Sequence, residues 1–349
     1  MNILILDFER WDSGLTNYAI LSASGLMARG HRVVFAGIGN MPPVNQARRK
    51  KLETVDFSNR ADIVKLLKLL GRYDIEIMNP HDGGSHFLCF PAKLFRGKKL
   101  KLVRSYSDAR PVKKHSLLWK QTDKFITAAE FIKRDFLENG LDSEKVKVIY
   151  QGISPDFFKG NAVEKTSSAG GFRVTILGRL DPVKGHAHFL ASAAIVSEKF
   201  PGTFFRVLGD EKNVKISGLE RESGKLGLKN VKFQGYVEDV ASSMKASDIG
   251  VIASVGSEAV SRTALEWMAS GTPLVVTDVG CLPEMVEAGR TGIVVPPGDP
   301  CAMADALCGL IENGRLRSEM GRAAFQRVKK KFSYERFITE TERTFLETL

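Results

Sequence analysis

The sequence is poor in cysteine and has no long hydrophobic run. Its 349 residues include only four cysteines, which are Cys89, Cys281, Cys301 and Cys308. They lack the spacing of a metal site and are too few to cross-link a chain of this length, so we expect reduced, mostly packed thiols. No apolar segment is long enough to span a bilayer, and residues 1–7 reach an acidic side chain too early for a signal peptide. These absences predict a cytoplasmic protein.

The sequence does contain a regular alternation of apolar strands and helices. A length of 349 residues with 43% hydrophobic residues suits two domains, each with its own core. Alternation of this kind produces parallel sheets covered by helices on both faces. A polar, glycine-containing stretch at 152–171 is the expected linker, which predicts an α/β protein with doubly wound domains at 1–155 and 156–331. The predicted strands are 2–6, 32–36, 75–78, 100–104, 124–127, 172–177, 204–208, 231–234 and 249–253, and the clearest early helix is 14–28.

Two glutamates, Glu258 and Glu266, are separated by seven residues at a predicted junction of strand and helix. Ser261 is the expected N-cap of a helix over 262–270. Glu258 lies before this helix, where it can accept sugar hydroxyls, and Glu266 lies about two turns into it, where it can reach a ribose. The helix dipole and the free backbone N–H groups at the start of this helix favour binding of an anionic oxygen. These N–H groups belong to Val260, Ser261, Arg262 and Thr263. The pattern predicts a pocket for a phosphorylated, hydroxyl-rich ligand, although the two glutamates by themselves also suit a solvated helix face.

A second motif directly follows the predicted strand at 172–177. Gly178 lets a ligand pass close to the backbone, and Arg179 and Lys184 come next. A planar guanidinium and a mobile ammonium group are suited to neighbouring oxygens of a diphosphate. Basic loop residues are commonly solvated, but the preceding strand and glycine favour binding.

These motifs resemble those of the retaining GT-B glycosyltransferases of family 4, also called glycosyl transferases group 1. The segment from Glu258 to Glu266 is similar to the family's pair of glutamates, and the resemblance continues through residues 271–280, 283–286 and 291–299. It implies two Rossmann-like domains facing across a cleft, an acceptor-binding N-terminal domain and a C-terminal domain that binds a nucleotide diphosphate sugar. It also implies a C-terminal helix at 332–349 that crosses back to the first domain, and a reaction that requires no metal cofactor.

The resemblance assigns roles to individual residues. Arg179 and Lys184 are implied to bind and stabilise the departing diphosphate, Glu258 to orient the transferred sugar and Glu266 to bind the ribose. The backbone at residues 260–263 is implied to hold the distal phosphate. Gly235 and Tyr236, which follow a predicted strand, are candidates for the base pocket.

The first domain offers candidates for the acceptor side. Ser13, Gly14 and Thr16 follow the first strand, where the family has a glycine-containing loop against the donor phosphate or the acceptor; a simple helix-start turn explains them equally well. His81 and His86 follow another strand end, and each is either an acceptor contact or a hydrogen-bonded loop histidine.

The segment from Lys93 to Lys120 is strongly basic, with one acidic residue, Asp108. Such a segment attracts a phosphate-rich or anionic surface. No nucleic-acid-binding module is recognisable, so we expect an anionic inner-membrane surface or a phosphorylated, lipid-linked glycan acceptor as the partner instead. Its ten cations are Lys93, Arg96, Lys98, Lys99, Lys101, Arg104, Arg110, Lys113, Lys114 and Lys120, interleaved with Phe95, Val112, Leu117, Leu118 and Trp119.

Within this basic segment, residues 104–111 resemble a stretch of bacterial family members that build lipopolysaccharide or other surface glycans, which makes Arg104 and Asp108 acceptor candidates. A histidine that many relatives carry near here is missing. The expected function is therefore transfer of a sugar to an acceptor hydroxyl of a cell-surface glycan. Two alternatives stay open: a sugar-nucleotide epimerase, which needs no acceptor, and a non-catalytic nucleotide-sugar-binding protein, since Val260 and Ser261 depart from the family's usual Phe and Gly.

Overall fold

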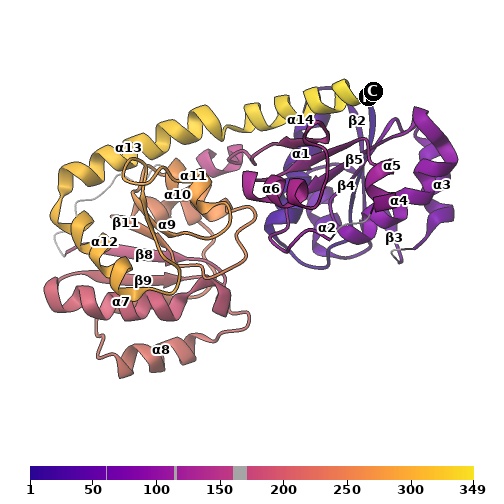
Figure 1. The fold of residues 1–349 in the computed structure, drawn as a ribbon. Coiled ribbons are helices and arrows are strands. Elements are labelled where there is room, and N and C mark those ends of the chain that lie inside the picture. Colours follow the sequence, from indigo (N-terminus) through magenta and orange to yellow (C-terminus); the bar gives the residue numbers. More distant parts are fainter. Residues whose placement is uncertain (60, 114–115, 160–170) are drawn as a thin grey trace. The chain divides into compact units, whose positions relative to one another are not determined.

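The computed structural model describes residues 1–59, 61–113, 116–159 and 171–349 (Figure 1). The chain divides into two compact units. Unit 1 contains residues 1–152 and 334–349, and unit 2 contains residues 153–333. Most of the expected linker, and Lys114 of the basic segment, lie outside the described residues.

Unit 1 is built on a sheet of seven parallel strands in the order β3-β2-β1-β4-β5-β6-β7. The central strand β1 is an apolar run whose residues from Ile3 to Asp7 are all buried, as expected for a strand covered on both faces. The strands are β1 Asn2–Asp7, β2 Arg32–Ile38, β3 Glu53–Phe57, β4 Ile77–Pro80, β5 Lys101–Tyr106, β6 Lys124–Thr127 and β7 Val146–Val148.

The helices of unit 1 begin at residues with suitable caps. Asp82 accepts a hydrogen bond from the Ser85 backbone N–H, and the Ser85 side chain accepts one from the Asp82 backbone, which forms a capping box at the start of α4. Asp62 caps α3 in a similar way. The helices are α1 Gly14–Ala28, α2 Pro42–Arg49, α3 Ile63–Arg72, α4 Gly83–Arg96, α5 Ser116–Gln121, α6 Glu130–Glu138 and α14 Tyr334–Thr348, with short 3-10 turns η1 Gly97–Lys99 and η2 Ser143–Lys145.

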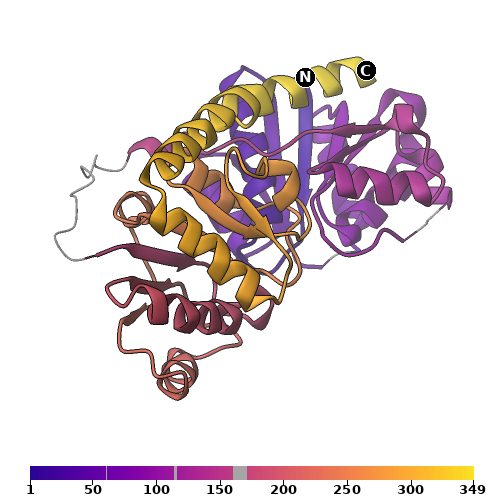
Figure 2. The ribbon, with the colours of Figure 1, turned by 60° about the vertical axis from the view of Figure 1, so that its left-hand side comes forward.

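The last helix, α14, belongs to unit 1 although it follows unit 2 in the sequence. It packs against α1, where Phe337 makes an edge contact with Tyr18 at 4.8 Å between ring centroids. Glu342 accepts hydrogen bonds from Arg29 and pairs with His31, each at 2.6 Å. Both ends of the chain therefore lie in unit 1, where Figure 2 shows them near each other.

Unit 2 contains six parallel strands in the order β10-β9-β8-β11-β12-β13. The strands are β8 Arg173–Leu177, β9 Phe204–Leu208, β10 Val231–Gln234, β11 Ile249–Ile252, β12 Leu274–Thr277 and β13 Ile293–Val295. The helices and 3-10 turns are η3 Pro155–Lys159, η4 Pro182–Lys184, α7 His186–Lys199, α8 Ile216–Lys225, α9 Val240–Lys245, α10 Arg262–Ala269, α11 Leu282–Met285, α12 Pro300–Glu312 and α13 Gly314–Lys331. Its core is formed by apolar residues of the central strands with α7 and α12.

The predicted fold class is confirmed: both units are α/β with parallel, doubly wound sheets. In each sheet the strand order reverses between two neighbouring strands, β1 and β4 in unit 1 and β8 and β11 in unit 2. Ligands of doubly wound sheets bind beyond the carboxyl ends of the strands at this reversal. Within the described residues, no helix combines the length and the apolar character that crossing a membrane demands.

Candidate functional site

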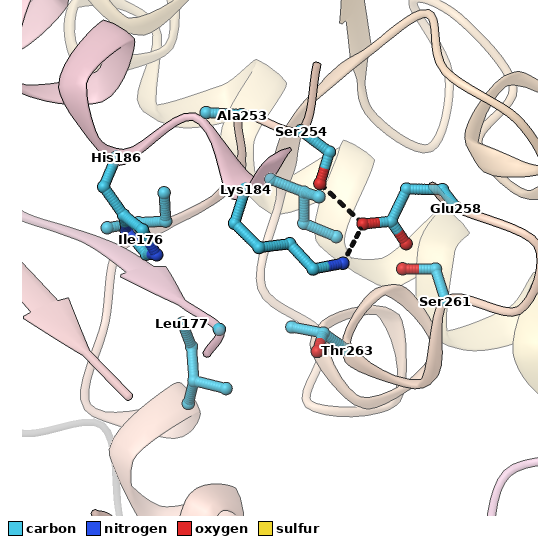
Figure 3. Close-up of a pocket in the computed structure, with 11 residues that line it drawn as sticks. Ile176, Leu177, Lys184, His186, Ala253, Ser254, Glu258, Ser261 and Thr263 are labelled. Atoms are coloured by element: carbon cyan, nitrogen blue, oxygen red, sulfur yellow. Dashed lines mark hydrogen bonds and ion pairs between the residues drawn. The ribbon is translucent and has the colours of Figure 1, made fainter. Parts of the chain in front are cut away.

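A pocket in unit 2 lies at the strand-order reversal, at the carboxyl ends of β8 and β11 (Figure 3). Its wall includes five residues predicted from the sequence, and it also includes His186, Ser254 and the last residues of both strands. The fold therefore brings the two sequence motifs to one place, because β8 and β11 are neighbours although about 70 residues separate them. The predicted residues that line the pocket are Gly178, Lys184, Glu258, Ser261 and Thr263.

Lys184 and Glu258 form an ion pair inside this pocket. The Glu258 side chain is only 3% exposed, and the Lys184 side chain is 24% exposed. One carboxylate oxygen, Oε1, accepts hydrogen bonds from Lys184 Nζ and, at 2.5 Å, from the Ser254 hydroxyl, and Figure 3 shows both groups pointing at it. The Lys184 ammonium group thus faces a buried carboxylate, while part of the lysine side chain stays exposed.

The backbone around Lys184 is tied to the end of β11. Asp181 accepts a hydrogen bond from Val183 N–H and so caps the turn η4. Val255 N–H donates to the carbonyl of Val183 at 2.8 Å. Gly185 follows with φ of 69°, and a Cβ at this position would collide with the carbonyl oxygen of Ala253. A glycine is required here because the turn and the strand end approach backbone to backbone.

Glu258 is held from its other side by the loop after β12. Cys281 N–H donates to the Glu258 carbonyl at 2.8 Å. Gly280 has φ of 56°, and a Cβ there would collide with the same carbonyl oxygen. Sequence reasoning did not assign a function to Ser254, Gly280 or Cys281, all of which position Glu258. The signal for Gly280 was present, since it ends the family-like segment at 271–280.

Glu266 lies in the second turn of α10, as predicted, but it does not line this pocket. Its carboxylate is 3.3 Å from Arg262 Nε. Burial raises the pKa of Glu266, and the guanidinium of Arg262 opposes this rise. Ser261 occupies the N-cap position, but its side chain makes no capping hydrogen bond to the described helix, which departs from the predicted role.

The remaining predicted donor residues of unit 2 lie outside the pocket lining. Arg179 has a side chain that is 45% exposed, with its guanidinium 3.8 Å from Asp181, and its carbonyl is 3.1 Å from His186 Nε2. Gly235 and Tyr236 follow β10, and Tyr236 is exposed. Val260 precedes α10 without entering the lining. A donor contact by these residues remains a proposal.

In unit 1 the predicted loop after β1 starts a helix. Ser13 caps α1 by accepting a hydrogen bond from Thr16 N–H at 3.2 Å, and Gly14 is the first helical residue. The Thr16 side chain is buried and donates to the Trp11 carbonyl at 3.3 Å. Ser13 and Thr16 therefore form a helix-start turn, and their contact with a donor phosphate or an acceptor stays a prediction.

His81 is fully buried and bonds through Nε2 to the Asn79 side chain at 2.8 Å. Burial, with a smaller effect of Arg104, lowers the pKa of His81 to about 3, so the ring is neutral. It presents no surface to a ligand, and the expectation that it contacts an acceptor is not supported. Nearby, at the end of β1, burial and the Asp82 carboxylate raise the pKa of Asp7 to about 7.

Three other acceptor candidates, His86, Arg104 and Asp108, line one cavity of unit 1. The cavity has a volume of about 280 Å³ and is open to solvent. Arg104 is buried and donates from Nη1 to the Pro80 carbonyl at 2.9 Å. Asp108 accepts a hydrogen bond from Arg110 Nε at 2.7 Å. The other lining side chains are mainly aromatic or apolar, which is typical of small-molecule sites with a few polar groups.

Two of the ten cations of the basic segment are buried. Lys93 is buried, where it donates to the Leu100 carbonyl at 2.6 Å and pairs with Asp123 at 2.8 Å. Arg104 is buried as well. Both side chains are buried because each finds hydrogen-bond partners inside unit 1. Lys93 bonds to the Leu100 carbonyl and to Asp123, and Arg104 bonds to the Pro80 carbonyl. Arg96, Lys98, Lys99, Lys113 and Lys120 remain exposed.

Metal ligands do not cluster within the part of the chain that the structure describes: no group of three or more His, Cys, Asp or Glu residues has an arrangement that could hold an ion.

Comparison with protein-family models identifies both halves of the chain. Residues 13–157 match the model of Glycosyltransferase Family 4, and residues 171–313 match that of Glycosyl transferases group 1. The chain has the two domains of a GT-B glycosyltransferase. These matches agree with the two doubly wound sheets and with the family resemblance of the sequence motifs.

Individual proteins add detail to this identification. Over 220 residues the chain is 29% identical to a D-inositol 3-phosphate glycosyltransferase of Paenarthrobacter aurescens, covering 60% of this chain and 53% of that protein. It is 32% identical over 165 residues to a phosphatidyl-myo-inositol mannosyltransferase of Mycobacterium leprae, covering 46% and 42%. The chain thus spans about half the length of these curated relatives. The crystal structure of Anabaena Alr3699/HepE in complex with UDP matches all of both chains with a TM-score of 0.88 at 20% identity, which establishes the fold.

Proposed function

We propose that the protein transfers a sugar from a nucleotide diphosphate sugar to an acceptor hydroxyl with retention of configuration. The observation that carries this proposal is the Lys184–Glu258 pair, which lies with Gly178 at the strand-order reversal of unit 2. An ammonium group and a carboxylate side by side match the two parts of such a donor, an anionic diphosphate and a hydroxyl-rich sugar. The UDP bound to the Anabaena neighbour supports the same class of ligand.

In the proposed reaction, Lys184 and Arg179 stabilise the negative charge that develops on the departing diphosphate. Such electrostatic stabilisation contributes several kcal/mol in a desolvated site, at about 2.7–4 kcal/mol for one donor group. The two cations make a metal cofactor unnecessary in this proposal. Glu258 orients the transferred sugar, Glu266 binds the ribose, and the backbone at 260–263 binds the distal phosphate.

The proposed acceptor is a phosphorylated, hydroxyl-rich molecule, either free or linked to a lipid. The names of the two curated relatives support this chemistry, since both act on inositol compounds that carry phosphate. The cavity at His86, Arg104 and Asp108 in unit 1 is the candidate acceptor site. A glycan of the bacterial cell surface, including lipopolysaccharide, remains within this class, and we propose that exposed lysines of the basic segment draw the protein to an anionic inner-membrane surface from the cytoplasmic side.

The donor site is tested by nucleotide binding. We expect Arg179→Ala and Lys184→Ala each to weaken nucleoside diphosphate affinity about ten- to a hundredfold, because each removes a charge-assisted contact of about 1.5–3 kcal/mol. Isothermal titration with UDP and GDP measures the affinity, after a thermal-shift screen of nucleotide sugars has selected the base. Lys225→Ala, an exposed cation on α8, is the matched control. Unchanged affinity in both site variants would overturn the assignment.

The same screen separates the alternatives. An epimerase converts the sugar of the donor without an acceptor, so chromatography of donor alone would reveal an isomer. A non-catalytic binding protein would be stabilised against thermal unfolding by a nucleotide sugar. It would catalyse neither sugar transfer nor slow hydrolysis of the donor. Transfer to a phosphorylated acceptor, with free nucleoside diphosphate released in equal amount, is the result we expect.

A further inference from the structure

His186 is a buried titratable residue of the unit 2 pocket that the proposed reaction does not use. It is the first residue of α7, it is 2% exposed, and Figure 3 shows its side chain at the pocket. Nε2 of the ring lies 3.1 Å from the Arg179 carbonyl oxygen. Nδ1 is buried and has no hydrogen-bond partner within the residues that the structure describes. The contact with Arg179 is therefore the one hydrogen bond of this imidazole among those residues.

This contact fixes the protonation of the ring. A carbonyl oxygen accepts a hydrogen bond but cannot donate one, so Nε2 must carry the hydrogen. Burial lowers the pKa of His186 and outweighs the hydrogen bond to Arg179, which raises it. The charge of Lys184 also lowers this pKa, and the Asp181 carboxylate raises it. The ring is thus the neutral tautomer, with a hydrogen on Nε2 and a lone pair on Nδ1.

Packing alone does not explain a histidine at this position. An apolar side chain such as leucine fills a buried site without leaving a polar atom unsatisfied. The unpaired Nδ1 of His186 instead costs free energy, because water no longer solvates it and no described group replaces the water. The histidine is therefore explained by the hydrogen bond that Nε2 donates.

The Arg179 carbonyl, which accepts this bond, has no partner in the sheet. The N–H groups of Gly178 and Leu180, on either side of it, donate to carbonyl groups at and beyond the end of β9, at 2.9 and 2.8 Å. Because successive peptide groups of an extended chain point to opposite sides, the Arg179 carbonyl is directed to the β11 side, where the pairing of β8 with β11 ends at Ile176. His186 supplies the donor that the sheet does not.

The Arg179 side chain makes no hydrogen bond of its own among the described residues. Its guanidinium is 3.8 Å from Asp181, which is beyond hydrogen-bond distance. The Asp181 carboxylate already accepts hydrogen bonds from Val183 N–H at 3.2 Å and from the Asn213 side chain at 2.7 Å. The guanidinium thus lies near a fixed negative charge and keeps its donors available to a ligand. Within the described part of the chain, Arg179 is held by a hydrogen bond only at its carbonyl, through His186.

We infer that His186 is a positioning residue of the donor site: its Nε2–H group holds the Arg179 carbonyl and so directs the Arg179 guanidinium toward the diphosphate of the donor. The inference rests on the proposed function, in which Arg179 contacts this diphosphate. His186 itself does not touch the donor. Its contribution to donor affinity is that of one neutral hydrogen bond acting through Arg179, roughly three- to tenfold.

A double-mutant cycle tests this role by isothermal titration with UDP and with GDP. His186→Leu should weaken the affinity roughly three- to tenfold. His186→Gln, whose amide N–H can still donate to the carbonyl, should restore it to within about twofold of wild type. In the Arg179→Ala background, His186→Leu should have no further effect, because no guanidinium is left to direct. His188→Leu is the matched control, since it removes an imidazole of the same helix that forms no hydrogen bond among the described residues.

The tautomer is measured separately by NMR of protein labelled with ¹⁵N in its histidines, in which His186→Gln identifies the signals of His186. We expect a hydrogen on Nε2 and none on Nδ1. A hydrogen on Nδ1 alone would overturn the inference, since the ring could not then donate to Arg179.

The cycle distinguishes failure of this inference from failure of the proposed function. If His186→Leu weakened the affinity equally in the wild-type and Arg179→Ala backgrounds, or did not weaken it in the wild type, the positioning role would be wrong and the donor site would stand. If Arg179→Ala itself left the affinity unchanged, the proposed role of Arg179 would be wrong and the inference would fail with it.

Discussion

Replacing Lys184 by alanine should destabilise unit 2 by leaving a buried charge without its partner. Glu258 is 3% exposed, and its Oε1 accepts hydrogen bonds from Lys184 and Ser254. Of these two donors, only the Ser254 hydroxyl remains in the Lys184→Ala variant. Breaking a fully buried pair costs about 3–5 kcal/mol. Because the Lys184 side chain is 24% exposed and water can partly replace it, we expect a loss of about 2 kcal/mol.

The double variant with Glu258→Gln tests whether the charge causes this loss. A neutral amide needs no counter-ion and can still accept the Ser254 hydrogen bond. We therefore expect Lys184→Ala with Glu258→Gln to be about 1 kcal/mol more stable than Lys184→Ala alone. Urea unfolding at pH 7 measures both, followed by tryptophan fluorescence in variants where Trp11 and Trp119 of unit 1 are replaced by phenylalanine, so that the buried Trp267 reports on unit 2. If the single and double variants lost the same free energy, the uncompensated carboxylate would not be the cause and the reasoning would be wrong.

Three further predictions concern other residues. Glu258→Gln should impair transfer while largely sparing nucleoside diphosphate affinity, whereas Glu266→Gln should weaken both. Calorimetry measures the affinity and steady-state kinetics measures transfer; the opposite pattern would mean that the two glutamates have exchanged roles. Gly280→Ala should lower transfer at least tenfold, since its φ of 56° and the nearby Glu258 carbonyl force the loop to move at a cost of about 1–3 kcal/mol, and wild-type kinetics would contradict this. Asp7→Asn should flatten the pH dependence of unit 1 stability. The pKa of Asp7 is raised from 3.8 to about 7, so the native state binds this proton more tightly than the unfolded state does. The stability of the wild type therefore falls as pH rises from about 4 through 7, by at most about 4 kcal/mol. Urea unfolding between pH 5 and 8.5 is the test, and parallel curves for the two proteins would refute it.

Much of the fold could be predicted because most strands are rich in apolar residues, either as short runs or in alternation with polar ones. The predicted strands at 124–127, 204–208 and 231–234 coincide with β6, β9 and β10. β3 was not predicted, since Glu53–Phe57 is polar and only partly buried at the sheet edge. The alternation of apolar and polar residues does not reveal a strand when neither of its faces is strongly apolar.

The candidate site could be predicted in its residues but not in its contacts. Lys184 and Glu258 were both selected from their own motifs, yet their pairing joins positions 74 residues apart and depends on the adjacency of β8 and β11. The sequence counts Lys93 among the cations of the basic segment but does not reveal its burial, because its partner, Asp123, is 30 residues away. Local sequence shows which side chains follow a strand, whereas the strand order decides which of them meet.

The position of α14 in unit 1 sets an order of events during synthesis. The ribosome releases residues 1–152 first, but the helix that buries Phe337, Ile338 and Phe345 against them is made after all of residues 153–333. At about 5–20 residues per second, unit 1 waits roughly 10–40 s for this helix. During that interval unit 2 can complete its fold while the surface of α1 that receives α14 remains uncovered. Chaperone capture at this stage would therefore be directed at unit 1, and a fragment that ends before Tyr334 would expose the same apolar surface permanently.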